Sequence, residues 1–233
     1  MSRSVVVHQY HHSFLMLLLT LLMAFILGIL LITVGEIAFE RIGFTSFEFT
    51  LILLGTLLGS LINIPVAEVR SAEPLVEVEE ARVFGLYFRI PRIMYQQVST
   101  VVAVNVGGAV IPVLVSIYLL VEHASLLLEA FAGLVIMAVL VHLMAKKVKG
   151  VGIVTPALLP PVLAAVIAYL LSPGSPAIVA YVSGTLGALI GADLTNLRGI
   201  AKLGAPMASI GGAGTFDGVF LTGIVAVLLV PLL

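Results

Sequence analysis

The sequence predicts an all-α polytopic membrane protein with seven transmembrane helices and a cytoplasmic N-terminus. The chain of 233 residues is 61% hydrophobic and only 10% charged, and its mean hydropathy is +1.25. Its apolar runs are about 20 residues long, which is the length of a helix that crosses the hydrocarbon core of a bilayer. Its lysines and arginines fall almost entirely on one side of the expected helices, as the positive-inside rule requires.

Seven apolar segments follow one another along the chain, and we expect each of them to be a transmembrane helix. They cover residues 13–34, 44–65, 98–121, 124–145, 154–172, 176–197 and 208–233. With these boundaries Arg41 alone lies on one side, and the other ten of the 11 lysines and arginines lie on the side of the N-terminus. The positive side faces the cytoplasm, so we expect a multi-pass protein of the cell membrane, with residues 1–233 as a single transmembrane domain.

The longest connection, residues 67–97, is the one insertion expected outside the membrane. Residues 76–79 alternate between valine and glutamate, and residues 83–90 are rich in residues that favour strands. This pattern predicts a short cytoplasmic β-hairpin between the second and third helices. A solvated amphipathic loop fits the same pattern equally well.

Three of the apolar segments contain residues that interrupt a regular helix. The third holds Asn105 followed by Gly107 and Gly108, the fifth opens with residues 155–161, and the seventh opens with residues 211–214. Irregular backbone at membrane depth is tolerated where protein or a water-filled cavity surrounds it, so these interruptions are candidates to line one interior space. Close packing of helices through small residues is the alternative explanation for the glycines.

Two aspartates stand out within the apolar segments. Asp193 falls near the cytoplasmic end of the sixth segment, and Asp217 falls near the cytoplasmic start of the seventh. Each costs about 2.5–3.5 kcal/mol to insert in a bilayer, so intramembrane acids generally serve a function. Two facing carboxylates would share one proton, which suits activation of water for peptide hydrolysis.

Two other roles for these aspartates stay open. The same pair suits a proton- or cation-coupled transporter or channel, because such proteins place ion sites at broken helices. Alternatively, Asp193 and Asp217 are structural, and the protein is a scaffold that binds other membrane helices through its small residues.

The residues around the aspartates resemble those of the presenilin and signal-peptide-peptidase class, the Gly-x-Gly-Asp intramembrane aspartyl proteases. Gly214-Thr215-Phe216-Asp217 stands where that class has its glycine motif, and Pro156-Ala157-Leu158 opens the fifth segment at the cytoplasmic side. The resemblance implies that Asp193 and Asp217 are catalytic and that a transmembrane peptide is the substrate. It also implies a substrate-binding role for Pro156, Ala157, Leu158, Gly214, Thr215 and Phe216. Two departures are Phe216 in place of a glycine and a Pro-Ala-Leu sequence upstream of the aspartates.

A second resemblance covers most of the chain. Residues 191–197 and 211–218, together with 63–65 and 105–109, are similar to a prokaryotic integral membrane family catalogued only as a domain of unknown function. This resemblance implies a membrane fold and supplies no activity.

Composition narrows the remaining classes. The chain has no cysteine, which excludes disulfides, thiolate metal sites and cysteine nucleophiles. Its net charge is −1 and it has no dense basic patch, so we expect no nucleic-acid partner. We expect no metal and no organic cofactor. The expected partners are membrane lipid and a transmembrane peptide, and the sequence leaves the oligomeric state open, a homo-oligomer included.

Overall fold

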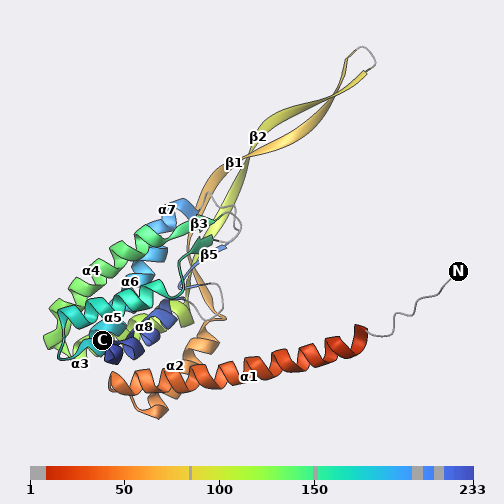
Figure 1. Ribbon diagram of the computed structural model, residues 1–233. Helices are drawn as coiled ribbons and strands as arrows, with labels where there is room; N and C mark the ends of the chain where they lie inside the picture. Colours follow the sequence, from red (N-terminus) through yellow and green to blue (C-terminus); the bar gives the residue numbers. More distant parts are fainter. Residues whose placement is uncertain (1–8, 84–85, 149–151, 201–206, 213–217) are drawn as a thin grey trace.

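The computed structural model describes residues 9–83, 86–148, 152–200, 207–212 and 218–233. In these ranges a bundle of helices carries a long β-hairpin that leaves the bundle at one end (Figure 1). The α-helices are α1 Gln9–Arg41, α2 Ser46–Gly59, α3 Ile111–Glu122, α4 Leu127–Met144, α5 Leu159–Leu171, α6 Pro176–Ala188, α7 Leu197–Ile200 and α8 Gly218–Leu229. Two π-helical turns, η1 Val106–Val110 and η3 Leu189–Asp193, and three 3-10 turns, η2 Ala124–Leu126, η4 Leu194–Asn196 and η6 Val230–Leu232, adjoin them.

Three helical stretches are long and apolar enough to cross a membrane, namely Met16–Arg41, Ala124–Met144 and Pro176–Asn196. Shorter apolar helices cover Ser46–Gly59, Val106–Glu122, Leu159–Leu171 and Gly218–Leu232. Large apolar side chains point away from the bundle, with Leu128 77% and Leu170 72% exposed. These features indicate a membrane protein. Each of the seven predicted segments overlaps one of these apolar helices, while their crossing of the membrane stays a prediction.

The predicted hairpin is present, but it is not short. Strand β1, Asn63–Val83, pairs antiparallel with β2, Leu86–Asn105, in a register that runs from Asn63 opposite Asn105 to Val83 opposite Leu86. Residues 63–65 and 98–105, which were predicted to belong to transmembrane helices, are therefore strand. The physical reason is the run of β-branched residues at 98–104, which is as apolar as a membrane helix but favours extended backbone.

A third strand joins the hairpin at its base. Strand β5, Met207–Ile210, pairs parallel with β2, with Val101 opposite Met207 and Val104 opposite Ile210, and the strand order is β1-β2-β5. The seventh predicted segment, 208–233, therefore begins as a strand rather than a helix. Its helix, α8, begins at Gly218.

The fifth predicted segment also begins later as a helix. Strands β3, Lys146–Val148, and β4, Gly152–Val154, form a small antiparallel hairpin, and α5 begins at Leu159. Pro160 and Pro161 lie in the first turn of α5, where the missing N–H groups have no helical partner to lose.

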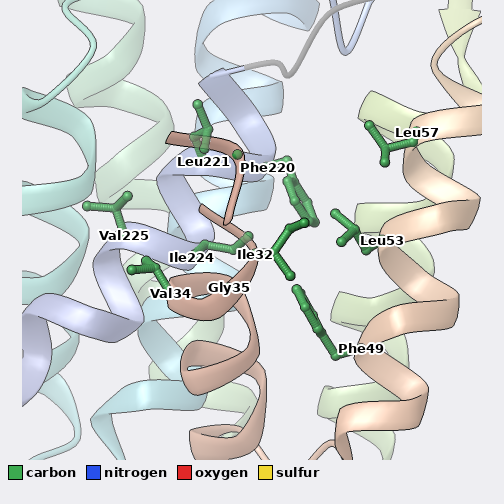
Figure 2. A pocket seen from close by; sticks show the side chains of 11 residues that line it. Ile32, Val34, Gly35, Phe49, Leu53, Leu57, Phe220, Leu221, Ile224 and Val225 are labelled. Atoms are coloured by element: carbon green, nitrogen blue, oxygen red, sulfur yellow. The ribbon is translucent and has the colours of Figure 1, made fainter. Parts of the chain in front are cut away.

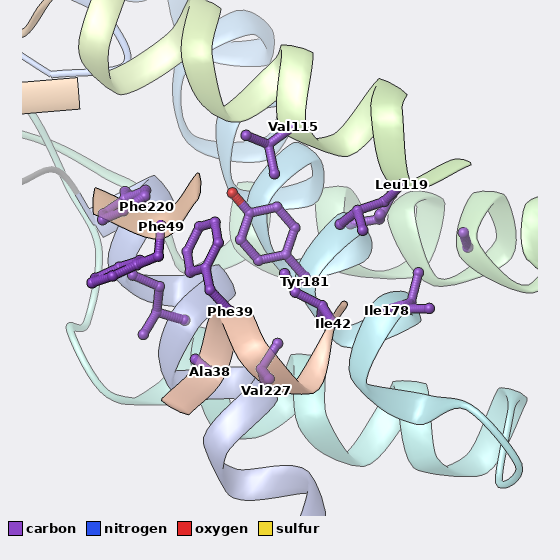
Figure 3. Packing of buried hydrophobic residues seen from close by; sticks show 13 residues of the cluster. Ala38, Phe39, Ile42, Phe49, Val115, Leu119, Ile178, Tyr181, Phe220 and Val227 are labelled. Carbon is purple, nitrogen blue, oxygen red and sulfur yellow. The ribbon is translucent and has the colours of Figure 1, made fainter. Parts of the chain in front are cut away.

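Helix α6 lies at the centre of the bundle and contacts α3, α4, α5 and α8. Tyr181 of α6 is fully buried, and the ring of Phe39 from α1 meets it edge to face with centroids 5.7 Å apart (Figure 3). Only the C-terminal part of α1 joins this core, because no residue in the most apolar stretch of α1 is buried. An apolar cavity of about 200 Å³ lies where α1 meets α2 and α8, lined by residues that include Ile32, Phe49 and Phe220 (Figure 2).

Candidate functional site

The candidate site is built around Asp193, the last residue of the π turn η3. This turn continues α6, and glycines let it press against α4. A Cβ at Gly187 would overlap the side chain of Met137, and a Cβ at Gly191 would overlap the carbonyl oxygen of Ala138. A π turn leaves the α-helical hydrogen-bond pattern, so the backbone around Asp193 needs other partners.

Polar side chains after Asp193 supply these partners. Asn196 is 2% exposed, and its Nδ2 donates to the carbonyl oxygens of Gly191, at 3.1 Å, and Ala192, at 2.9 Å. The hydroxyl of Thr195 donates to the Gly191 carbonyl oxygen at 2.7 Å. Nδ1 of His142 in α4 forms a hydrogen bond with the same hydroxyl at 2.7 Å. These hydrogen bonds hold the backbone of the turn that ends at Asp193.

The carboxylate of Asp193 meets the backbone that follows β5. Its Oδ2 accepts a hydrogen bond from the N–H of Gly211 at 2.7 Å, and the side chain is half-buried. Gly211 and Gly212 have φ angles of +82° and +87°, which side-chain-bearing residues rarely adopt. This bond joins two segments 18 residues apart and places Asp193 at the start of the glycine-rich stretch that leads to Asp217.

The π turn η1 lies directly against Gly211. A Cβ at Gly108 would overlap the carbonyl oxygen of Gly211, and a Cβ at Gly107 would overlap that of Thr56 in α2. Three backbone segments therefore meet here without intervening side chains. They are the end of α2, the turn η1 and the end of β5.

A buried amide holds this meeting point together. Asn105, 1% exposed, accepts a bond from the N–H of Gly108 at 2.7 Å. Its Nδ2 donates to the carbonyl oxygen of Ser60 at 2.7 Å and to Oδ1 of Asn63 at 3.1 Å. Oδ1 of Asn63 also accepts a bond from the hydroxyl of Ser209 at 2.5 Å. Every polar group of the Asn105 side chain is thus engaged.

The other half of the predicted site falls outside the described residues. Gly214, Thr215, Phe216 and Asp217 all lie in the range 213–217. The residues that flank this range are described. Ile210 before it and Val219 after it share one buried cluster with Ala188 and Leu189, just before Asp193.

The structure places Pro156, Ala157 and Leu158 between β4 and α5, and all three are exposed. The strand before them, β4, contacts η3. The Pro-Ala-Leu sequence thus follows directly on a segment that touches the turn ending at Asp193.

Several polar residues of the site were missed as site residues from the sequence, among them Asn63, Asn105, Ser209 and Asn196. The available signal was the presence of asparagines inside apolar runs, which is costly unless their groups are bonded. In the described part of the chain, no group of three or more His, Asp or Glu side chains is placed to hold a metal ion.

A known protein family matches most of the chain. The profile of the family DUF1614, described as a protein of unknown function, matches residues 57–229. The chain belongs to the DUF1614 family. The matched range contains the hairpin, both π turns, Asp193 and Asp217, and it begins after α1 and near the end of α2. Neither the curated proteins nor the solved structures contain a match to the chain.

Membership in DUF1614 confirms the expected resemblance to a family of unknown function over most of the chain. It does not extend to the presenilin and signal-peptide-peptidase class, and a relationship to those proteases stays a hypothesis.

Proposed function

We propose that this DUF1614 protein is an intramembrane aspartyl protease that cleaves transmembrane peptides with Asp193 and Asp217. The observation that carries the proposal is the hydrogen bond from the Gly211 N–H to Asp193 Oδ2. It anchors the chain six residues before Asp217, and six residues span about 20 Å between Gly211 and Asp217 at full extension. The packing of Val219 with Leu189 supports a short distance between the two aspartates, because it anchors the chain on the other side as well.

The chemistry requires one proton shared by the two carboxylates. The ionised aspartate removes a proton from water as the water oxygen attacks the scissile carbonyl carbon, and the protonated aspartate donates its proton to the carbonyl oxygen. Collapse of this tetrahedral intermediate breaks the C–N bond. The leaving nitrogen takes the proton from the aspartate that deprotonated the water, and the other aspartate regains its proton from a hydroxyl group of the intermediate. The polar environment of Asp193, with a backbone donor at 2.7 Å, supports its role as the ionised member.

Strand β5 gives the site a way to hold a substrate. It is an outer strand of the described three-stranded sheet, and it ends one residue before Gly211, whose N–H bonds Asp193. An unwound substrate segment would pair with such an edge through its backbone. We assign Pro156, Ala157, Leu158, Gly214, Thr215 and Phe216 to the surroundings of that segment, because the first three follow β4 next to η3 and the others precede Asp217.

We further propose that all seven apolar helices cross the cell membrane, with the N-terminus in the cytoplasm. In support, the base of the hairpin, the β3–β4 hairpin, α7 and β5 gather at one end of the bundle (Figure 1). Each of these segments lies in or next to a loop predicted to be cytoplasmic, and these loops together with the N-terminal tail carry ten of the 11 lysines and arginines. Asp193 then lies near the cytoplasmic face. Because the chain has no cysteine, single introduced cysteines at Ser175 and Lys147 would report opposite sides by labelling of intact cells.

A cleavage assay tests the proposal directly. The purified full-length protein in liposomes is mixed with single-span peptides, and Asp193→Asn and Asp217→Asn are compared with the unaltered chain. Glu122→Gln is the matched control, because Glu122 is exposed at the end of α3. We expect both aspartate variants to lose cleavage by at least about 100-fold and the control to retain it. Cleavage retained by either aspartate variant would exclude the dyad.

The two π turns favour one alternative, a proton- or cation-coupled transporter that uses the same aspartates. The turn η3 ends the regular α-helix of α6 and η1 begins the helical stretch that continues as α3, and ion sites in transporters lie where helices are irregular in this way. Glu129 on α4 has a buried oxygen without a hydrogen-bond partner among the described residues. Proton flux into liposomes that disappears in Asp193→Asn and Glu129→Gln, without any peptide cleavage, would decide for transport.

A further inference from the structure

We infer that Ser209, Asn63 and Asn105 are positioning residues that hold the Gly211 N–H on the carboxylate of Asp193. The geometric part of this inference stands by itself, and its consequence for catalysis rests on the proposed protease function. None of the three side chains is bonded to Asp193 in the structure. They act through strand β5 and the turn that follows it.

The first step is the anchor. Asn105 is almost completely buried, and it joins three elements: the N–H of Gly108 in η1, the carbonyl oxygen of Ser60 after α2, and Oδ1 of Asn63 at the start of β1. Its position at the end of the paired hairpin, opposite Asn63, fixes these contacts in one register. Asn63 thereby presents Oδ1 in a set direction.

The second step is the transfer from the anchor to β5. The Ser209 hydroxyl donates to Oδ1 of Asn63 at 2.5 Å across 146 residues of sequence. Strand β5 is only four residues long, and backbone pairing with β2 alone allows a slip along the strand. Ala208 and Ile210 have no side-chain donor, so only one register brings a hydroxyl to Asn63. The Ser209–Asn63 bond therefore selects that register.

The third step is the placement of the Gly211 N–H next to Asp193. In the selected register Gly211 comes two residues after Ser209, its carbonyl oxygen packs on the bare Cα of Gly108, and its N–H points to Asp193. The cap that Asn105 places on Gly108 thus shapes the surface on which Gly211 rests. A slip of one residue would leave Asp193 with a different backbone donor or none.

Hydrogen exchange of the Gly211 amide tests the geometry without any assay of activity. We compare the full-length protein in nanodiscs with Ser209→Ala, which removes the donor, and Ser209→Thr, which keeps it. Ser116→Ala is the matched control, because Ser116 is a buried serine that donates to the carbonyl oxygen of Pro112 in α3. We expect exchange at Gly211 to accelerate about fivefold to tenfold in Ser209→Ala and to stay unchanged in the other two variants. Unchanged exchange in Ser209→Ala would overturn the inference.

Cleavage kinetics then separate this inference from the proposed function. We expect Ser209→Ala to lower kcat about tenfold with little change in KM, and Ser209→Thr to keep the kcat of the unaltered chain. The reason is that the Ser209 hydroxyl positions the Asp193 carboxylate and not the substrate. If the unaltered chain cleaves no peptide, the protease proposal fails while the exchange data still decide the geometry. Faster exchange together with a normal kcat would overturn the catalytic part of the inference.

Discussion

The two π turns, η1 and η3, are built alike and differ in what they present. The turn η1 opens the helical stretch that continues as α3, and η3 closes α6. Each is pressed through a glycine onto the backbone of a neighbouring element, and each has an asparagine that bonds its free backbone groups. The turn η1 contains no ionisable group, whereas η3 ends in Asp193. The comparison indicates that such a turn by itself is a structural joint, a point where backbone segments meet, and that the acid makes η3 a candidate site.

Filling the contact between η1 and Gly211 should have the largest effect on stability. In Gly108→Val, the added side chain would overlap the carbonyl oxygen of Gly211 and push β5 away from η1. We expect a loss of about 3 kcal/mol or more, measured by thermal unfolding in detergent. Gly28→Ala is the control, since nothing lies within 4 Å of the added Cβ, and it should leave the midpoint unchanged. Equal stability of the two variants would contradict the packing at η1.

Removing the amide that caps η1 should have the next largest effect. Asn105→Ala leaves the N–H of Gly108 and the carbonyl oxygen of Ser60 without their partner in a buried position. We expect a loss of about 2–3 kcal/mol in the free energy of unfolding, measured by the same method. A loss below about 0.5 kcal/mol would mean that water reaches these groups and that η1 is not a dry joint.

Much of this comparison could be predicted from the sequence, because composition and local pattern decide it. The apolar segments, the hairpin between 67 and 97, the interruption at Asn105–Gly108 and the prominence of Asp193 all follow from short stretches of residues. The extent of the hairpin did not, since residues 98–104 are apolar enough for either a membrane helix or a strand. Hydropathy alone does not distinguish the two.

The joint itself could not be predicted, because its partners are remote in sequence. Asn105 bonds Asn63 across 42 residues, and Ser209 bonds Asn63 across 146. A single polar side chain in an apolar run indicates that it needs a hydrogen-bond partner, but the local sequence does not show which residue that partner is. The pairing of Asp193 with Asp217 belongs to the same class, and it stays a prediction.

Neutralising the acid of η3 should separate function from stability. In Asp193→Asn the side-chain oxygen can still accept the bond from the Gly211 N–H, although without the charge that strengthens it. We expect the free energy of unfolding to change by no more than about 1 kcal/mol, while cleavage is lost. A variant that unfolds as readily as Asn105→Ala would make Asp193 a structural residue and η3 a second joint.

Asn196 and His142, which hold η3 in place, differ in burial, and this difference predicts unequal effects on stability when each is removed. Asn196 is 2% exposed and bonds two carbonyl oxygens, so Asn196→Ala should cost about 1–2 kcal/mol. His142 is exposed, and the Thr195 hydroxyl that it bonds already donates to Gly191. Water can replace the imidazole there, so His142→Ala should stay within about 0.5 kcal/mol. If His142→Ala cost as much as Asn196→Ala, the imidazole would help to hold η3 rather than be a surface contact. The conformation of η3 would then depend on a side chain of the neighbouring helix α4, more than the conformation of η1 depends on a side chain of any neighbouring helix.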